Sequence, residues 1–250
     1  MNLAAVPARR TGARREPNWE ALDLSTLSLE ERTLLGKTWR SRAKSEHLAV
    51  SAFCILSTEA AREGAPRELL SILTKAANDE VRHAELCDVY AARLLGDALT
   101  QFSGEIKPPR YEGVSGREEQ LLHVVGMCCL NETMTGVYLT EMVSCVDDPT
   151  VRDLLESLLE DEIDHGRVGW AFAARAVEQG WGRRVLQHWL PTLKEQSLAP
   201  VRRNKSEADL AMAPKLSKYG YISASDGIAL YERTWAEVIA PGFAQLGVVV

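Results

Sequence analysis

The sequence predicts an all-α protein in which four long helices form two hairpins joined by a long crossover, with additional helices at the C-terminal end. Three observations lead to this prediction. Apolar residues recur at helical spacing over long stretches, and no segment alternates apolar and polar residues with the period of a strand. Glycine and proline residues separate the long stretches, as expected where helices end.

The N-terminal segment, residues 1–24, is polar, contains proline and is predicted to be a disordered tail. Arginines at positions 9, 10, 14 and 15 make it basic, but no apolar segment follows them, so a secretory signal is not indicated. We therefore expect the helical domain to begin at about residue 25.

The first hairpin is predicted from a capping signal and a break. Ser28 and Glu31 fit a capping box at the start of a helix over 28–63. Gly64 and a proline two residues later interrupt the helical spacing. A second helix is then predicted over 67–95, with a glycine directly after it.

The second hairpin follows a segment rich in glycine and proline, residues 96–116, which we interpret as the crossover. A third helix is predicted from there to about residue 145. Pro149 is well placed as the first residue of the fourth helix, which runs to about Gln179. Residues 25–180 would then form the four-helix bundle.

Four prolines divide the C-terminal part into short pieces. Helices are predicted over 182–190, 192–202, 205–218 and 226–240. We expect this extension, residues 181–250, to pack on the bundle, with Trp170, Trp181, Trp189 and Trp235 between the two parts.

Composition restricts the class of protein. The chain has 46% hydrophobic and 26% charged residues and a net charge of −6, which is typical of a globular protein and argues against a nucleic-acid partner. No apolar run reaches the roughly 18 residues that a membrane helix requires. The cysteine number is odd, five, and no CxxC occurs. These features favour reduced thiols and a cytoplasmic location.

Two helices carry the same pattern, Asp-Glu-x-x-His, on stripes that are otherwise apolar. The segment DEVRH contains Glu80 and His83, and DEIDH contains Glu162 and His165. Residues three apart lie on one helix face. A carboxylate and an imidazole on a core-facing stripe are costly to bury unless they have partners, so each pair requires an explanation.

The other two helices each carry one glutamate in the middle of the stripe. In an antiparallel hairpin, two residues face each other when the turn lies midway between them. This condition pairs Glu46 with Glu80 and Glu132 with Glu162. Glu59 is the alternative on the first helix, but its midpoint with Glu80 falls inside a helix. We therefore favour Glu46.

Four glutamates and two histidines suit a pair of divalent cations. Two such cations would offset four buried negative charges. Carboxylate oxygens with imidazole nitrogens, and no thiolate, favour iron or manganese. The predicted metal ligands are Glu46, Glu80, His83, Glu132, Glu162 and His165. His47, His123 and His188 lack this context and are predicted not to bind metal.

At these residues the chain resembles the ferritin-like superfamily of di-iron carboxylate proteins, which includes rubrerythrins and di-iron oxygenases. The resemblance covers about residues 28–180. It implies that Glu80 and Glu162 bridge two iron ions, that Glu46 and Glu132 are terminal ligands, and that His83 and His165 bind one ion each. A mixed Mn/Fe or a manganese pair fits the same ligands.

Asp79 and Asp161 each precede an E-x-x-H glutamate. One interpretation pairs Asp79 with His165 and Asp161 with His83, so that each aspartate orients the histidine of the opposite helix. The other interpretation is a solvated carboxylate beside the stripe. The residues alone leave both open.

Three classes of function compete. The favoured one is a non-haem di-iron oxidoreductase that activates O2 to oxidise or oxygenate a small organic substrate, with an external electron donor and a homodimer both compatible. The alternative is an iron-storage or peroxide-scavenging protein like ferritin or rubrerythrin. The extension over 181–250 and the missing paired CxxC argue against it. A metal-free scaffold would leave four core carboxylates unbalanced.

Small residues near the predicted ligands have two interpretations. Gly136, Gly166 and Gly169 would leave space for O2 and a substrate, or allow close helix packing. Side chains that would line a pocket, or belong to the core, are Thr135, Tyr138, Cys87 and Cys128.

Overall fold

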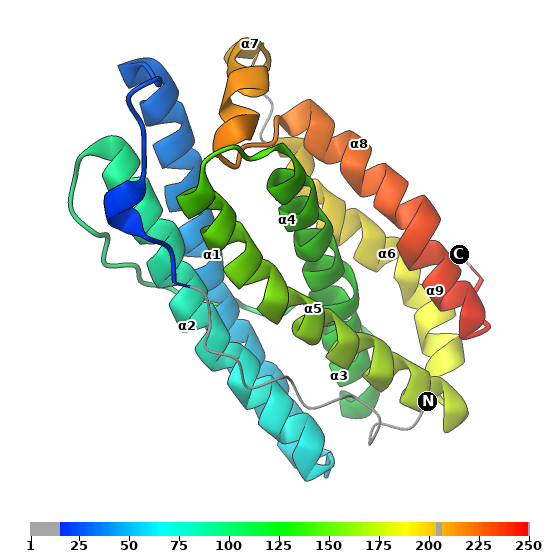
Figure 1. Ribbon diagram of the computed structural model, residues 1–250. Helices are drawn as coiled ribbons and strands as arrows, with labels where there is room; N and C mark the ends of the chain where they lie inside the picture. Colours follow the sequence, from blue (N-terminus) through cyan, green and yellow to red (C-terminus); the bar gives the residue numbers. More distant parts are fainter. Residues whose placement is uncertain (1–15, 204–206, 250) are drawn as a thin grey trace.

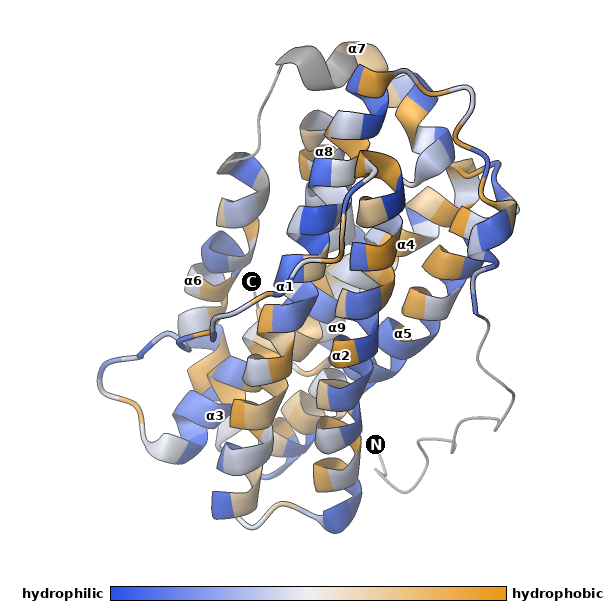
Figure 2. Cartoon of the chain, turned by 90° about the vertical axis from the view of Figure 1, so that its left-hand side faces the viewer, coloured by the Kyte–Doolittle hydropathy of each residue, from blue (hydrophilic) through white to orange (hydrophobic). Residues whose placement is uncertain are grey.

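The computed structural model describes residues 16–203 and 207–249, and all regular secondary structure in these ranges is helical. The predicted all-α class is confirmed (Figure 1). Figure 2 shows hydrophobic and hydrophilic residues interspersed along the helices, as expected of amphipathic helices. In the part of the chain that the structure describes, no helix has a long apolar stretch of the kind that crosses a bilayer.

The first helix pair consists of α1 (Leu29–Arg62) and α2 (Arg67–Leu95). The capping box predicted at the start of α1 is present, because Ser28 Oγ accepts from the backbone N–H of Glu31 while Glu31 accepts from that of Ser28. At the end of α2, Gly96 adopts a left-handed conformation with φ 70°, which costs glycine little. The two long helices lie side by side (Figure 1).

The second pair consists of a three-part helix and α5 (Pro149–Glu178). The three parts are α3 (Gly116–Val124), the π-helical segment η3 (Val125–Glu132) and α4 (Thr133–Cys145). The sequence predicted one regular helix here, and the π-helical segment was missed. Packing of η3 and α4 against α5 forms the second long pair.

The C-terminal part contains α6 (Gly182–Arg203), α7 (Glu207–Leu216), the 3-10 turn η4 (Ser217–Tyr219), α8 (Ala224–Thr234), the π-helical η5 (Trp235–Ile239) and α9 (Ala240–Gln245). The predicted break at Pro191 is wrong, because α6 continues through it. A proline inside a helix costs about 3 kcal/mol. Leu186, Leu190 and Leu193 are buried on this helix, and each buried leucine stabilises by roughly 1.5–3 kcal/mol, so packing outweighs the cost.

The C-terminal helices cover the second pair. In Figure 1, α6, α8 and α9 lie beside α3 and α4, on the side away from α1 and α2. One apolar cluster joins α3, η3 and α5 to α6, η5 and α9, and Trp235 is buried in it. Trp170, Trp181 and Trp189 pack against the same cluster. The tryptophans therefore lie where the sequence predicted them.

The end of the predicted N-terminal tail packs on the helices. Residues 1–15 of that tail lie outside the described residues, but Trp19–Ala21 form a short 3-10 helix. Trp19 stacks on Tyr90 of α2 with ring centroids 6.2 Å apart. The apolar Trp19 ring thus anchors this part of the segment on α2, and the disordered tail stays a prediction.

The two helix pairs contact each other through α2 and α5 and through α1 and α3. This arrangement agrees with two hairpins joined by the long segment between α2 and α3. Assignment to the ferritin-like bundle topology remains a prediction, as do the domain limits.

His123 of α3 fastens the crossover to α1. Its Nε2 donates to the carbonyl oxygen of Pro109 at 2.9 Å, and its Nδ1 lies 3.0 Å from Glu59 Oε1. Burial by itself would lower the pKa of His123, but the hydrogen bonds to Glu59 and to the Pro109 carbonyl raise the pKa above 6.5. His123 therefore acts as a structural cation.

We predict that Glu59→Gln destabilises the protein by about 1–3 kcal/mol at low pH, because it removes a charged hydrogen-bond partner. The folded-state pKa of His123 is raised, so this stabilisation is complete below pH 6.5 and is lost as pH rises through the folded pKa. Urea unfolding at pH 6 and pH 9 measures the difference. Glu63→Gln, at the C-cap of α1, is the matched control. An equal effect of Glu59→Gln at both pH values would contradict the assignment.

Candidate metal centre

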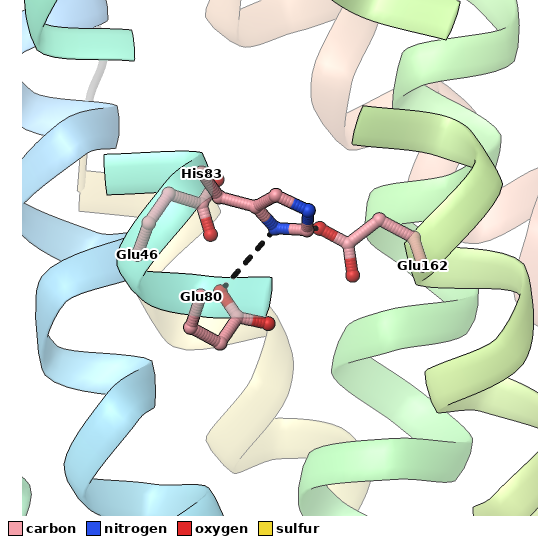
Figure 3. A group of neighbouring side chains, drawn as sticks. All are labelled: Glu46, Glu80, His83 and Glu162. Atoms are coloured by element: carbon pink, nitrogen blue, oxygen red, sulfur yellow. Dashed lines mark ion pairs between the residues drawn. The ribbon is translucent and has the colours of Figure 1, made fainter. Parts of the chain in front are cut away.

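Two matching pairs of side chains face each other between α2 and α5. Glu80 and His83 come from α2, and Glu162 and His165 come from α5. All four are at most 1% exposed. Figure 3 shows Glu80, His83 and Glu162, with Glu46 of α1, pointing toward one another. The spacing of three residues places each pair on one face of its helix, so both helices direct the pair inward.

The Nδ1 atom of each histidine faces both glutamates. His83 Nδ1 lies 3.5 Å from Glu80 Oε2 and 3.4 Å from Glu162 Oε1. His165 Nδ1 lies 3.3 Å from Glu80 Oε1 and 3.2 Å from Glu162 Oε2. Each glutamate therefore offers one oxygen to each histidine, and the arrangement has approximate two-fold symmetry.

The opposite ring nitrogens contact aspartates across the helix pair. His83 Nε2 lies 3.4 Å from Asp161 Oδ2, and His165 Nε2 lies 3.4 Å from Asp79 Oδ2. Both aspartates are fully buried, so they are not solvated carboxylates beside the stripe. The contacts run crosswise, from each helix to the histidine of the other. This leaves Nδ1 of each ring as the atom that faces the centre.

Glu46 and Glu132 complete the cluster from the remaining two helices. Glu46 of α1 is 8% exposed, and Glu132, at the end of η3, is 4% exposed. Arg42 Nε donates to Glu46 Oε1 at 3.0 Å, whereas Glu132 Oε2 lies 4.0 Å from His165 Nδ1. Glu59, the alternative on α1, contacts His123 instead.

These side chains form two groups that could each hold a metal ion. The ligand atoms within a group all lie within 4.8 Å of one another. Glu80 and Glu162 belong to both groups; Glu46 and His83 complete the first, and Glu132 and His165 complete the second. Two adjacent cation positions sharing two carboxylates are therefore compatible with this geometry.

The neighbouring carboxylates raise the pKa of both histidines. Burial alone would lower the pKa of His83, but Asp161, Glu162 and Glu80 raise it well above 6.5. The pKa of His165 is raised in the same way by Asp79, Glu162 and Glu80. Without a bound cation, both rings are thus held as imidazolium ions, which offset part of the carboxylate charge. A metal ion would displace these protons, because it binds neutral imidazole.

The pKa values of Glu46, Glu132 and Glu162 are shifted in different directions. Burial raises the pKa of Glu46 to about 8, although Arg42 opposes the shift. Burial and the charge of Glu162 raise the pKa of Glu132 well above 4.5. Burial would also raise the pKa of Glu162, but the neighbouring Glu132, His165 and His83 lower it. The raised pKa of Glu46 and Glu132 follows from the cost of burying several carboxylate charges together.

The donor set fits divalent iron or manganese. His83 Nδ1 and Glu80 Oε2 are buried and have no hydrogen-bond partner among the described residues. Such atoms are costly in a protein interior unless a further group satisfies them. Carboxylate oxygens with two imidazole nitrogens are ligands that iron and manganese accept.

Two cations near the aspartates were missed by the sequence analysis. Arg82 Nη2 donates to Asp161 Oδ2 at 2.9 Å and to the carbonyl oxygen of Ser157 at 3.0 Å. Lys75 Nζ contacts Asp79 and lies 3.4 Å from Asp161 Oδ1. Lys75 stands four residues before Asp79, and that spacing is a signal for an ion pair on one helix. Together with Arg82, it offsets the aspartate charges and leaves the net negative charge on the glutamates.

Gly169, one turn after the second E-x-x-H, allows close helix packing. A Cβ atom at Gly169 would lie 2.6 Å from Cys128 Cβ and 2.7 Å from the backbone nitrogen of Cys129. Both contacts belong to η3, so the π-helical segment approaches α5 at this position. Of the two interpretations of Gly169, the structure supports packing. Cys128 is fully buried and belongs to the core.

No family model matches the sequence, and comparisons with curated proteins and with solved structures gave no significant match. The resemblance to ferritin-like di-iron proteins therefore stays a prediction that rests on the site residues.

We predict that Asp161→Asn lowers the metal affinity of the centre by about 10–100-fold, the usual effect of losing a carboxylate that orients a histidine ligand. Asp164→Asn on the same helix is the matched control, because Asp164 pairs with Arg167 at the surface. Anaerobic titration with Fe²⁺ or Co²⁺ measures both affinities. Equal affinities in the two variants would contradict the orienting role of Asp161.

Proposed function

We propose that the protein is a non-haem di-iron oxidoreductase that uses O2 to oxidise or oxygenate a small organic substrate. One observation carries the proposal: two buried groups of ligand atoms share Glu80 and Glu162 and contain one histidine each. A single metal ion does not require this duplication. A pair of ions sharing two carboxylates does.

In this proposal Glu80 and Glu162 would be ligands shared by the two ions. Glu46 with His83, and Glu132 with His165, would each complete the ligands of one ion, the histidines through Nδ1. The assignment follows the shared and unshared members of the two groups. A mixed Mn/Fe or a manganese pair would use the same ligands.

A pair of ferrous ions, when bound, supplies electrons for the reduction of O2. The protein residues supply orientation and a dry environment. Asp161 and Asp79 accept the Nε2–H of His83 and His165, which fixes both rings. Arg42 holds one oxygen of Glu46, so that the other oxygen is free to turn toward the ions.

Apolar side chains exclude water from the centre. Phe53 of α1 lies against the His165 ring, with centroids 5.0 Å apart, and Phe53 and Cys128 are at most 1% exposed. Exclusion of water strengthens the electrostatic interactions within the site and protects a strong oxidant from side reactions. Return of the ions to the ferrous state would use an external electron donor.

We predict that the protein isolated from iron-replete cells contains two iron ions per chain, measured by elemental analysis. His83→Ala and Glu162→Ala should each lose iron, because each removes a ligand, while circular dichroism shows most of the helicity retained. Glu160→Ala, an exposed change on α5, is the control and should keep both ions. Normal iron content in either ligand variant would refute the assignment.

The ferrous protein should consume O2, and a small organic substrate should accelerate the consumption. An oxygen electrode measures the rate with and without candidate compounds. Gel filtration separates the alternative class, because an iron-storage protein forms a large hollow assembly. Iron uptake into such an assembly, with no effect of any organic compound, would favour storage over oxidation.

A further inference from the structure

A cleft of about 550 Å³ opens beside the Glu46 end of the candidate centre. It lies between α1, α4 and the segment that leads into α8. Arg42, Trp39 and Lys37 of α1 form one wall, and Tyr138 and Met142 of α4 lie in another. Clefts of this size accommodate small organic ligands.

The charge of this cleft is opposite to that of the protein. The chain carries a net charge of −6, yet none of the described residues that line the cleft is acidic, and two of them, Lys37 and Arg42, are cationic. Lys37 is exposed and forms no ion pair among the described residues. Two cations in a concave surface without a carboxylate between them attract an anion.

Arg42 connects the cleft to the metal centre. Its Nε donates to Glu46 Oε1 at 3.0 Å, and its side chain remains 20% exposed. The guanidinium lies over the Trp39 ring, 5.6 Å from the ring centroid. Its Nη atoms have no hydrogen-bond acceptor among the described residues. One guanidinium thus contacts a proposed ligand through Nε and keeps two further donors, a geometry that suits a carboxylate.

The remaining wall of the cleft is largely apolar. Met142, Tyr221 and Ile222 line it, and the Tyr138 hydroxyl is occupied, because it donates to the Gly227 carbonyl oxygen at 2.7 Å. A ligand with an apolar body would be buried against these side chains, while its anionic group meets Arg42 and Lys37.

We propose that this cleft binds the substrate, and that the substrate is an organic acid whose carboxylate pairs with Arg42 and Lys37. The inference rests on the proposed function, since it names the substrate class of the same centre. Arg42 binds the substrate here: its Nη atoms would hold the acid while its Nε holds Glu46.

The test compares octanoate with octan-1-ol and octylamine, which share the alkyl chain and differ in charge. Isothermal titration calorimetry on the full-length protein, with its iron content determined, measures each affinity. We expect octanoate to bind about tenfold or more tightly than octan-1-ol, and octylamine more weakly than either, because only octanoate forms charge-assisted hydrogen bonds with the two cations.

Variants locate the binding. Lys37→Gln and Arg42→Gln should weaken octanoate binding about tenfold and leave octan-1-ol binding unchanged, whereas Lys44→Gln, an exposed cation on α1 outside the cleft, should change neither. Ser45→Trp, which places a large ring in the cleft, should weaken both. If octan-1-ol binds as tightly as octanoate, or Lys37→Gln behaves like Lys44→Gln, the proposal is wrong.

The outcome is separable from that of the proposed function. If the protein contains no iron but binds octanoate in a way that depends on Lys37, the cleft is a binding site for organic acids and the proposed di-iron activity is refuted. If the protein contains two irons, consumes O2 faster only with uncharged compounds and does not bind octanoate, the di-iron activity is supported and the acid substrate is refuted.

Discussion

The balance of charge among four buried glutamates is the constraint on which the rest of the structure depends. Each buried carboxylate loses hydration worth several kcal/mol, and the cluster lies where apolar residues from both helix pairs meet. Without metal, protons offset part of this cost, because burial raises the pKa of Glu46 and Glu132 and the surrounding carboxylates raise the pKa of both histidines. Two divalent cations would perform the same task and release these protons. Protons and metal ions would therefore compete for one set of atoms.

Helix packing determines how the charged side chains of the cluster are oriented. The crosswise contacts of Asp79 and Asp161 fix the histidine rings only if α2 and α5 lie in one register, and Arg82 ties that register to the Ser157 backbone of α5. On the η3 side of the centre, the π-helical segment packs closely against Gly169 of α5. Glu132 is the last residue of this segment, so it lies near α5. Extra residues in a helical turn are frequent at functional sites, and here the turn places a proposed ligand.

Much of the fold and of the candidate site was predictable from sequence because the signals are local. Spacing of three residues placed Glu80 with His83 and Glu162 with His165, and the midpoint of each hairpin selected Glu46 and Glu132. The features that were missed depend on contacts between distant segments. The sequence of η3 does not distinguish a π turn from an α turn, since the close approach of Gly169 is a tertiary contact. Continuation of α6 through Pro191 likewise depends on leucines buried against other helices. Arg82 contacts Asp161 only because α2 and α5 are neighbours.

The departure from two-fold symmetry distinguishes the two ends of the centre. Glu80 and Glu162 are equivalent in their contacts, but Glu46 pairs with Arg42, whereas no lysine or arginine among the described residues forms an ion pair with Glu132. On the Glu132 side, Cys128 of η3 packs closely against Gly169 of α5. The Glu46 end adjoins the cleft. Since a cation beside a terminal carboxylate competes with the metal for that carboxylate, Glu46 would be held less firmly by its ion than Glu132. In the proposed di-iron centre, the end that faces the cleft would thus be the end where a ligand is most easily displaced, which would suit entry of O2 and a substrate from that side.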